Sequence, residues 1–280
     1  MCCTPRNTRS KARGRRSSSI AARASSSPKR GGPSPPKRSR SSAPSSNRCS
    51  AFSKGVDVRV AVIIPAFQAA ATIRDIISRT HATVSAAEII VVDDGSTDGT
   101  RASAGDVAIA HDQNCGKGAA LRDGVREALA RGASVLVTID ADGQHPPEEI
   151  PRLLHPIQEG RADLVLGARK RDRVMPLSRR FTNWLSATLA SRISGQQVRD
   201  AQTGFRAFTR DVAQQVQPAG DRYEYEANFL LDALQAGYRV ASVEVPTIYG
   251  SHSHFRGWSD TWRMARAFAR HAGRIVAGAT

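Results

Sequence analysis

The sequence predicts an α/β fold, with a mostly parallel central sheet covered by helices on both faces. The first observation is a set of short, nearly all-apolar runs rich in β-branched residues, at 59–65, 88–94, 134–142, 163–169 and 238–246. The second is the presence of helical patterns between the early runs, over 70–83 and 117–131. Strands of this kind that alternate with helices are typical of parallel sheets buried on both faces.

The first 55 residues differ sharply in composition from the rest. The chain carries a net charge of +16, but residues 1–55 hold 14 Lys and Arg and no acid, while the other 225 residues hold 27 basic and 25 acidic residues. Because Ser, Arg and Pro dominate this segment, we expect residues 1–55 to form a disordered basic tail. A nucleic-acid partner is not expected, since its basic surface should lie on the folded part.

The sequence shows neither a membrane-spanning segment nor a cysteine pattern typical of a metal site. No apolar run approaches the ~18 residues that a membrane-spanning helix needs. The four cysteines, Cys2, Cys3, Cys49 and Cys115, show no metal-ligand spacing, and we do not expect a disulfide framework. Both observations favour a cytoplasmic location, where thiols stay reduced.

Paired acids follow the third apolar run. In an extended strand residues i and i+2 face the same side, so Asp140 and Asp142 can face one cation. Oxygen ligands alone suit Mg²⁺ or Mn²⁺, which would accept further ligands from a substrate diphosphate. The alternative is a capped loop before a helix that starts at Pro147.

Two further loops lie at the ends of predicted strands. The acids in 92–98 can accept hydrogen bonds from a nucleoside, or they can form a turn and a helix N-cap. The segment 114–118 (NCGKG) resembles a phosphate loop but lacks the Walker A spacing, so a P-loop NTPase is excluded. We interpret it as a glycine-rich helix entrance rather than as a phosphate contact by Lys117.

Taken in order, several strings resemble family 2 glycosyltransferases, and among them the dolichyl-phosphate mannosyltransferase branch. They are VAVIIPAF, IIVVDDGSTDGT, NCGKGAALRDG, TIDADGQHPPEEIP, LVLGAR, DAQTGFRAF and VEVPTIYGSHSHFR, within about residues 59–262. The resemblance implies a GT-A type nucleotide-diphospho-sugar transferase fold over 56–257. It also implies inverting sugar transfer from a donor of the GDP-mannose or UDP-glucose type to polyprenyl phosphate.

The resemblance also implies roles for individual residues. The donor nucleotide is expected at Pro65, Phe67, Val92 and Asp94, and the metal and diphosphate at Asp140, Ala141, Asp142 and Gln144. The catalytic residues are expected to be Asp142, Arg169 and Asp200. Acceptor or phosphate binding is expected at Arg179, Arg206, His254 and Arg256. The chain departs from the family at Phe67-Gln68-Ala69, where Tyr-Asn-Glu is frequent, and in the lid loop, where His252 and His254 stand.

Two apolar-striped segments bear on the acceptor. Both the segment 181–193 and the C-terminal segment 258–280 place apolar residues on one helical stripe. Such a helix lies in a membrane interface or packs on its own core. Because two such segments flank the predicted acceptor residues, we favour contact of an amphipathic 258–280 helix with a membrane surface. Six basic residues against one acid lie between Arg169 and Arg180 and suit binding of the acceptor phosphate.

Two other functions compete with this one. In cell-envelope polysaccharide synthesis the same donor chemistry acts on a saccharide hydroxyl, and Asp200 would then have to act as the general base. A noncatalytic sugar-nucleotide sensor, with the tail as its working part, is the rival from another class. The full set of Asp140, Asp142, Arg169 and Asp200 argues against it.

Overall fold

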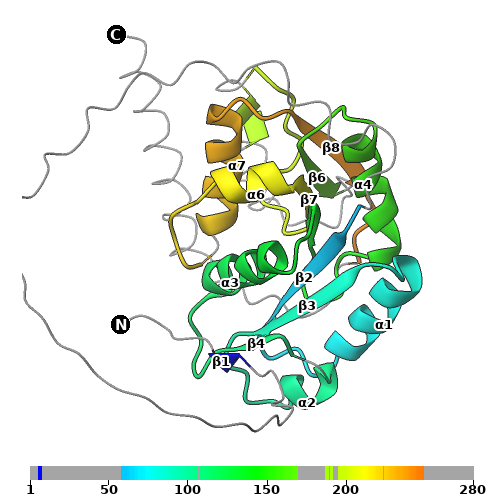
Figure 1. Ribbon diagram of the computed structural model, residues 1–280, viewed down its shortest axis with the longest axis vertical. Helices are drawn as coiled ribbons and strands as arrows, with labels where there is room; N and C mark the ends of the chain where they lie inside the picture. The colour runs from blue at the N-terminus through cyan, green and yellow to red at the C-terminus, as the bar shows by residue number, and fades with distance from the viewer. Residues whose placement is uncertain are drawn as a thin grey trace, which may run out of the picture.

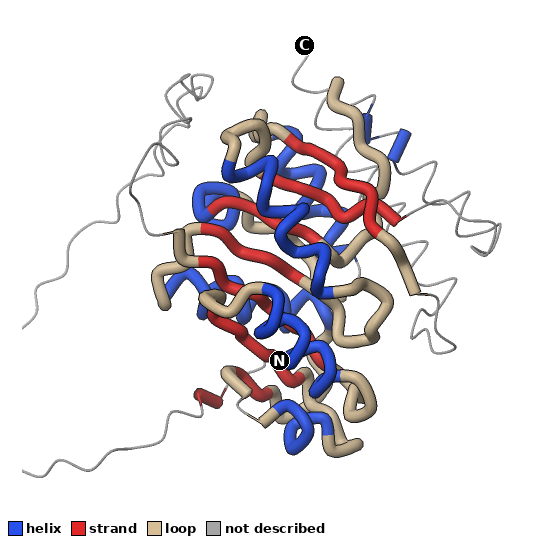
Figure 2. The backbone as a smooth tube through the Cα atoms, turned by 90° about the vertical axis from the view of Figure 1, so that its right-hand side faces the viewer, coloured by secondary structure: helices blue, strands red, loops and turns tan. Residues whose placement is uncertain are grey.

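The computed structural model describes residues 6–7, 58–105, 107–169, 187–188, 190–191, 195–222 and 224–248. These form an eight-stranded sheet in the order β1-β4-β3-β2-β5-β7-β6-β8. The strands are β1 (Arg6–Asn7), β2 (Val60–Ala66), β3 (Glu88–Asp93), β4 (Ile109–Ala110), β5 (Val135–Thr138), β6 (Leu164–Arg169), β7 (Arg206–Thr209) and β8 (Val240–Val245). The twisted sheet crosses the molecule between two layers of helices (Figures 1 and 2).

The sheet is mostly parallel, as predicted. Strands β2 to β5 pair in parallel through β4-β3-β2-β5, and β6 pairs in parallel with β8. Strand β7 runs antiparallel between β5 and β6, and β1 runs antiparallel beside β4. All five predicted strands are present, and the two strands that the apolar runs did not reveal within 100–210 are the short β4 and β7.

The helices bury two separate apolar clusters against the two faces of the sheet. On one face lie α3 (Lys117–Ala130), α6 (Arg210–Gln215) and α7 (Glu224–Gln235). On the other lie α1 (Ile73–Thr83) and α4 (Ile150–Gln158), the latter preceded by a 3₁₀ turn at Pro147–Glu149. A short helix, α2 (Thr100–Ala104), follows β3. β-Branched residues line both faces of β2, which suits a strand buried on both sides.

Several sequence predictions lie outside the described residues. These are Arg179, His254, Arg256, the 258–280 helix and the basic tail apart from β1. The predicted apolar stripe of Phe181, Leu185, Leu189 and Ile193 also lies outside the described residues. In the same segment, Ala187 and Ala190 are buried in the same cluster as α3 and α7. Among the helices of the described ranges, none is long and apolar enough to cross a membrane.

Candidate active site

The turn after β5 carries the paired acids and is held from two sides. The Thr72 hydroxyl, at the start of α1, donates to the Ala141 carbonyl at 2.6 Å. The Gln144 carbonyl accepts from the Ile248 N–H at 2.9 Å, and the Gln144 N–H donates to Asp142 Oδ1 at 3.0 Å. The backbone of the turn is therefore fixed by α1 and by the segment after β8, and the Asp142 carboxylate is oriented by the Gln144 N–H.

Asp140 lies in a charged cluster that α3 and α7 complete. Lys117 Nζ lies 2.6 Å from Asp140 Oδ1 and 3.0 Å from Glu226 Oε1. Although burial alone would lower the pKa of Lys117, its two carboxylate partners raise it well above the usual value, so this ammonium stays charged. Lys117 in turn keeps the pKa of Asp140 below its usual range against the opposing effect of burial.

The donor set fits a divalent cation. Desolvation and the nearby Asp140 charge raise the pKa of Asp142, so two carboxylates repel each other at one end of the sheet. A cation bound between them removes that repulsion. Asp140, Asp142 and the Gln144 amide offer oxygen ligands only, which Mg²⁺ and Mn²⁺ prefer. These are the three residues that the resemblance implies as metal ligands, and their donor atoms fit such a site.

Arg169 and Asp200 form a two-pronged ion pair beside this cluster. Arg169 lies at the end of β6, and its Nε and Nη2 donate to the two carboxylate oxygens of Asp200 at 2.8 and 3.2 Å. The Gln202 N–H also donates to Asp200, at 3.0 Å. Asp200 is 1% exposed, and although burial opposes ionisation, Arg169 lowers the pKa of this carboxyl. Asp200 is thus an ionised, fully engaged carboxylate, and a poor proton acceptor.

Asp94 anchors the loop that leads into α3. Its carboxylate accepts the N–H groups of Cys115 and Gly116 at 2.8 and 2.9 Å, and the His111 ring contacts it at 2.7 Å. The second ring nitrogen of His111 contacts Asp123 at 3.0 Å. The hydrogen bonds to Asp123 and then Asp94 raise the pKa of His111 to about 9, so a buried imidazolium bridges two carboxylates. The nucleoside contact predicted for Asp94 stays a prediction. The side chain is 2% exposed, and its carboxylate is already bonded to these three partners.

The end of β2 forms the outer wall of the site. Pro65 is buried in the strand, whereas Phe67 exposes 39% of its surface just beyond it. Gln68 has a positive φ of 51°, and its backbone N–H donates to the Ser96 hydroxyl at 3.0 Å. Its side-chain carbonyl accepts the Thr97 N–H at 2.9 Å. Gln68 therefore joins the two loops expected to hold the nucleoside, with Val92 buried in β3 beneath them.

The glycines of the 114–118 loop serve packing, as the helix-entrance interpretation predicts. A Cβ on Gly116 would lie 2.3 Å from the Asp221 carbonyl oxygen, and one on Gly118 would lie 2.7 Å from the Tyr225 Cβ. The Ala119 N–H already donates to the same Asp221 carbonyl. Lys117 does more than begin the helix, because its side chain reaches Asp140 from the first position of α3.

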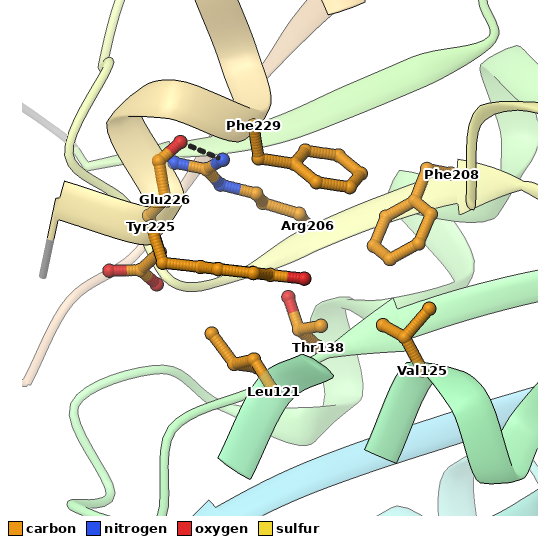
Figure 3. Close-up of a pocket in the computed structure, with 8 residues that line it drawn as sticks. All are labelled: Leu121, Val125, Thr138, Arg206, Phe208, Tyr225, Glu226 and Phe229. Carbon is orange, nitrogen blue, oxygen red and sulfur yellow. Dashed lines mark hydrogen bonds between the residues drawn. The ribbon is translucent and has the colours of Figure 1, made fainter. Parts of the chain in front are cut away.

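The phosphate-binding role predicted for Arg206 is not supported. Arg206 is 3% exposed, and its three nitrogens donate to the backbone carbonyls of Thr203, Glu226 and Ala201 at 2.7, 2.7 and 3.2 Å. It lies in the interior beside a small cavity with space for about one water. Figure 3 shows its lining residues: Leu121, Val125, Thr138, Arg206, Phe208, Tyr225, Glu226 and Phe229. Arg206 braces the 201–206 turn against α7 and does not face a substrate.

Two residues near the acids were missed by the sequence analysis. His145 is 4% exposed, packs on the Phe205 ring at a centroid distance of 5.3 Å, and leaves its buried Nδ1 without a hydrogen-bond partner. Burial lowers the pKa of His145 to about 4, so it is neutral. Glu226, on α7, is the second partner of Lys117. Only the position of His145 directly after Gln144 signals its proximity, and nothing in the sequence signals Glu226.

One residue behaves differently from the prediction that the cysteines stay reduced. Cys115 is disulfide-bonded. Its sulfur lies within 4.8 Å of ligand atoms of Asp94 and His111, an arrangement that resembles a metal site. A disulfide sulfur is not a thiolate, and His111 already bridges two carboxylates, so we do not assign a metal there.

Comparison with known proteins adds independent findings. The model of glycosyl transferase family 2 matches residues 61–217. A polyprenol monophosphomannose synthase of Mycolicibacterium smegmatis is 34% identical, over 68% of this chain and 77% of the relative. A UDP-N-acetylglucosamine–dolichyl-phosphate N-acetylglucosaminyltransferase of Methanococcus voltae is 30% identical, over 72% of this chain and 90% of the relative.

The structure of glucosyl-3-phosphoglycerate synthase from Mycobacterium tuberculosis, with Mn²⁺, UDP and phosphoglyceric acid, superposes with a TM-score of 0.61 at 23% identity. That match covers 77% of this chain and 78% of the other, and it shows a shared fold.

Proposed function

This chain belongs to glycosyl transferase family 2, and we propose that it moves a sugar from a nucleotide-diphospho-sugar to polyprenyl phosphate with the help of a divalent cation. The enzyme class and the GT-A type fold agree with the sequence predictions. The proposal concerns the acceptor, the metal and the roles of the individual residues.

The ion pair between Arg169 and Asp200 is the observation that favours a phosphate acceptor over a hydroxyl acceptor. A hydroxyl acceptor needs a base to take its proton as it attacks. Asp200 is the carboxylate that would do so, but both of its oxygens accept hydrogen bonds from Arg169, and its pKa is lowered. A phosphate monoester needs no such base, because it already carries a charge of about −1.5 to −2 at neutral pH. The names of the two relatives, which include polyprenol and dolichyl phosphate, support the same acceptor class.

The bond changes then follow simply. An oxygen of the acceptor phosphate forms a bond to the anomeric carbon of the sugar. The bond from that carbon to the donor diphosphate breaks, and its electron pair leaves with the nucleoside diphosphate. No proton has to move in this step when the acceptor is fully ionised, and attack from the face opposite the leaving group inverts the anomeric centre.

The residues of the site provide charge stabilisation for the departing diphosphate. A divalent cation, when bound by Asp140, Asp142 and Gln144, supplies a Lewis acid for the diphosphate oxygens. Lys117 lies beside Asp140 and provides an ammonium at the same place. Interactions of this kind gain strength as negative charge develops on the leaving group, so they favour the transition state over the bound donor.

The remaining roles follow from position. Pro65, Phe67, Val92 and Asp94 would form the nucleoside site, with exposed Phe67 available to pack on the base. Arg169, oriented by Asp200, would face the phosphates of donor or acceptor. The acceptor chain would stay in a membrane, so the enzyme would work at a membrane surface.

The proposal is tested by incubating purified protein and Mn²⁺ with a bacterial polyprenyl phosphate and a panel of labelled nucleotide sugars. The expected product carries the label into the organic phase with at least one donor. A parallel series with saccharide acceptors tests the hydroxyl alternative. Water-soluble products from saccharides, with no organic-phase label from any donor, would refute the proposed acceptor.

A further inference from the structure

Lys117 lies between two carboxylates, and only one of them is a candidate metal ligand. Asp140 Oδ1 lies 2.6 Å from the ammonium, and Glu226 Oε1 lies 3.0 Å from it on the other side. Glu226 is 7% exposed, and it comes from α7, more than 80 residues after the acids of the metal site. Neither the donor nor the acceptor chemistry described above needs a buried carboxylate at this place.

The backbone of Glu226 is held in place by a contact that does not involve its carboxylate. Arg206 donates to the Glu226 carbonyl at 2.7 Å and thereby ties the first turn of α7 to the turn before β7. That turn contains Gly204, where a Cβ would lie 2.5 Å from Asp140 Oδ2 and 2.8 Å from Lys117 Nζ. The Asp140–Lys117 pair is thus packed directly against the Gly204 backbone, with Glu226 as the ammonium's other carboxylate partner.

The charges explain what a second carboxylate contributes. Asp140, Lys117 and Glu226 together carry one net negative charge, whereas Asp140 and Lys117 alone are neutral. A divalent cation that takes Asp140 as a ligand removes one partner from Lys117 and brings two positive charges close to the ammonium. Without another carboxylate, that repulsion would weaken binding of the cation or displace the lysine.

We propose that Glu226 is a positioning residue that retains Lys117 beside the metal site when a divalent cation takes Asp140. Lys117 and the cation then act on the same diphosphate. The inference rests on the metal role in the proposed function, and it adds a residue that does not itself touch metal, donor or acceptor.

The test measures Mn²⁺ binding to the full chain without donor, by the electron paramagnetic resonance signal of free Mn²⁺. The proteins are the wild type, Glu226→Gln, Lys117→Met and the double variant. Because Glu226 acts through Lys117, Glu226→Gln should weaken Mn²⁺ binding about tenfold in the wild-type background and less than about twofold in the Lys117→Met background. Asp221→Asn, which removes an exposed acid that pairs with Arg122, is the matched control and should leave affinity unchanged.

A Glu226→Gln effect of equal size in both backgrounds would mean that Glu226 acts only as a distant charge, and it would overturn the inference. Glu226→Asp gives a second measurement if the Gln variant folds poorly. It keeps the charge but draws it away from Lys117 Nζ, so positioning predicts weaker Mn²⁺ binding and a pure charge effect predicts none. A wild type that binds no Mn²⁺ would overturn both the metal role and the inference. A wild type that binds Mn²⁺ with no dependence on Lys117 would overturn the inference alone.

Discussion

The buried imidazolium of His111 makes the stability of the fold depend on pH on the alkaline side. His111 contacts Asp94 at 2.7 Å and Asp123 at 3.0 Å, and Asp123 also pairs with Arg126 at 2.7 Å. These carboxylates hold the protonated form, so the pKa of His111 rises to about 9 from its usual 6.5. A raised pKa means that the contribution is fully present below pH 6.5 and is lost as the pH rises through 9.

The size of the effect follows from that shift. A difference of about 2.5 pH units between folded and unfolded chains corresponds to about 3 kcal/mol in the free energy of unfolding. Urea unfolding of the wild type at pH 6 and pH 9.5 should therefore show a loss of about this amount. The substitution His111→Gln removes the titrating group, and it should lower stability at pH 6 while abolishing most of the difference between the two pH values.

The control variant is His81→Gln, which removes a histidine at an exposed position on α1. It should keep the wild-type difference in stability between pH 6 and pH 9.5. Equal stability of the wild type at pH 6 and pH 9.5 would contradict the reasoning. So would a His111→Gln variant that retains the full alkaline loss.

Three further substitutions test the site. Gly204→Ala places a Cβ 2.5 Å from Asp140 Oδ2, so it should cost about 1–3 kcal/mol in thermal or urea unfolding and weaken Mn²⁺ binding; wild-type Mn²⁺ affinity would contradict the packing. Asp142→Asn, or EDTA on the wild type, should lower the transfer rate by at least about 10²-fold, and full activity in EDTA would refute the metal assignment. Arg206→Met removes the side-chain donor to three backbone carbonyls and should lower unfolding stability by more than about 2 kcal/mol. A phosphate-binding Arg206 would instead change only the acceptor KM.

Much of the fold could be predicted because its strands are continuous apolar runs. The 88–94 run predicts β3 because a strand buried on both faces is a continuous apolar run, without alternating polar residues. Strand β7 was harder to predict, because its first residue is Arg206, and a charged residue in the sequence does not indicate a buried position. Only the tertiary structure shows that backbone carbonyls surround this guanidinium.

The candidate site was predictable where its residues are neighbours in sequence. Asp140 and Asp142 share one turn, and the spacing alone brings them together. Lys117 and Glu226 reach that turn from two helices that lie far apart in the chain, and no local pattern encodes their meeting. The pairing of Asp200 with Arg169 likewise depends on how the segment before β7 folds back on the end of β6. That pairing favours an orienting role for Asp200 over the role of general base that the hydroxyl-acceptor alternative would require.

The most direct measurement compares two acceptors that differ only in the phosphate. A polyprenyl phosphate and the corresponding polyprenol, with the same chain, are supplied in detergent with the donor that gives the highest turnover. Because both oxygens of Asp200 accept from Arg169, we expect transfer to the phosphate and none above background to the alcohol. With the phosphate, kcat/KM should also rise with pH around the second phosphate ionisation, at about 6. Transfer to the alcohol at a comparable rate would refute the phosphate acceptor, because it would require a base that the Arg169–Asp200 pair does not provide.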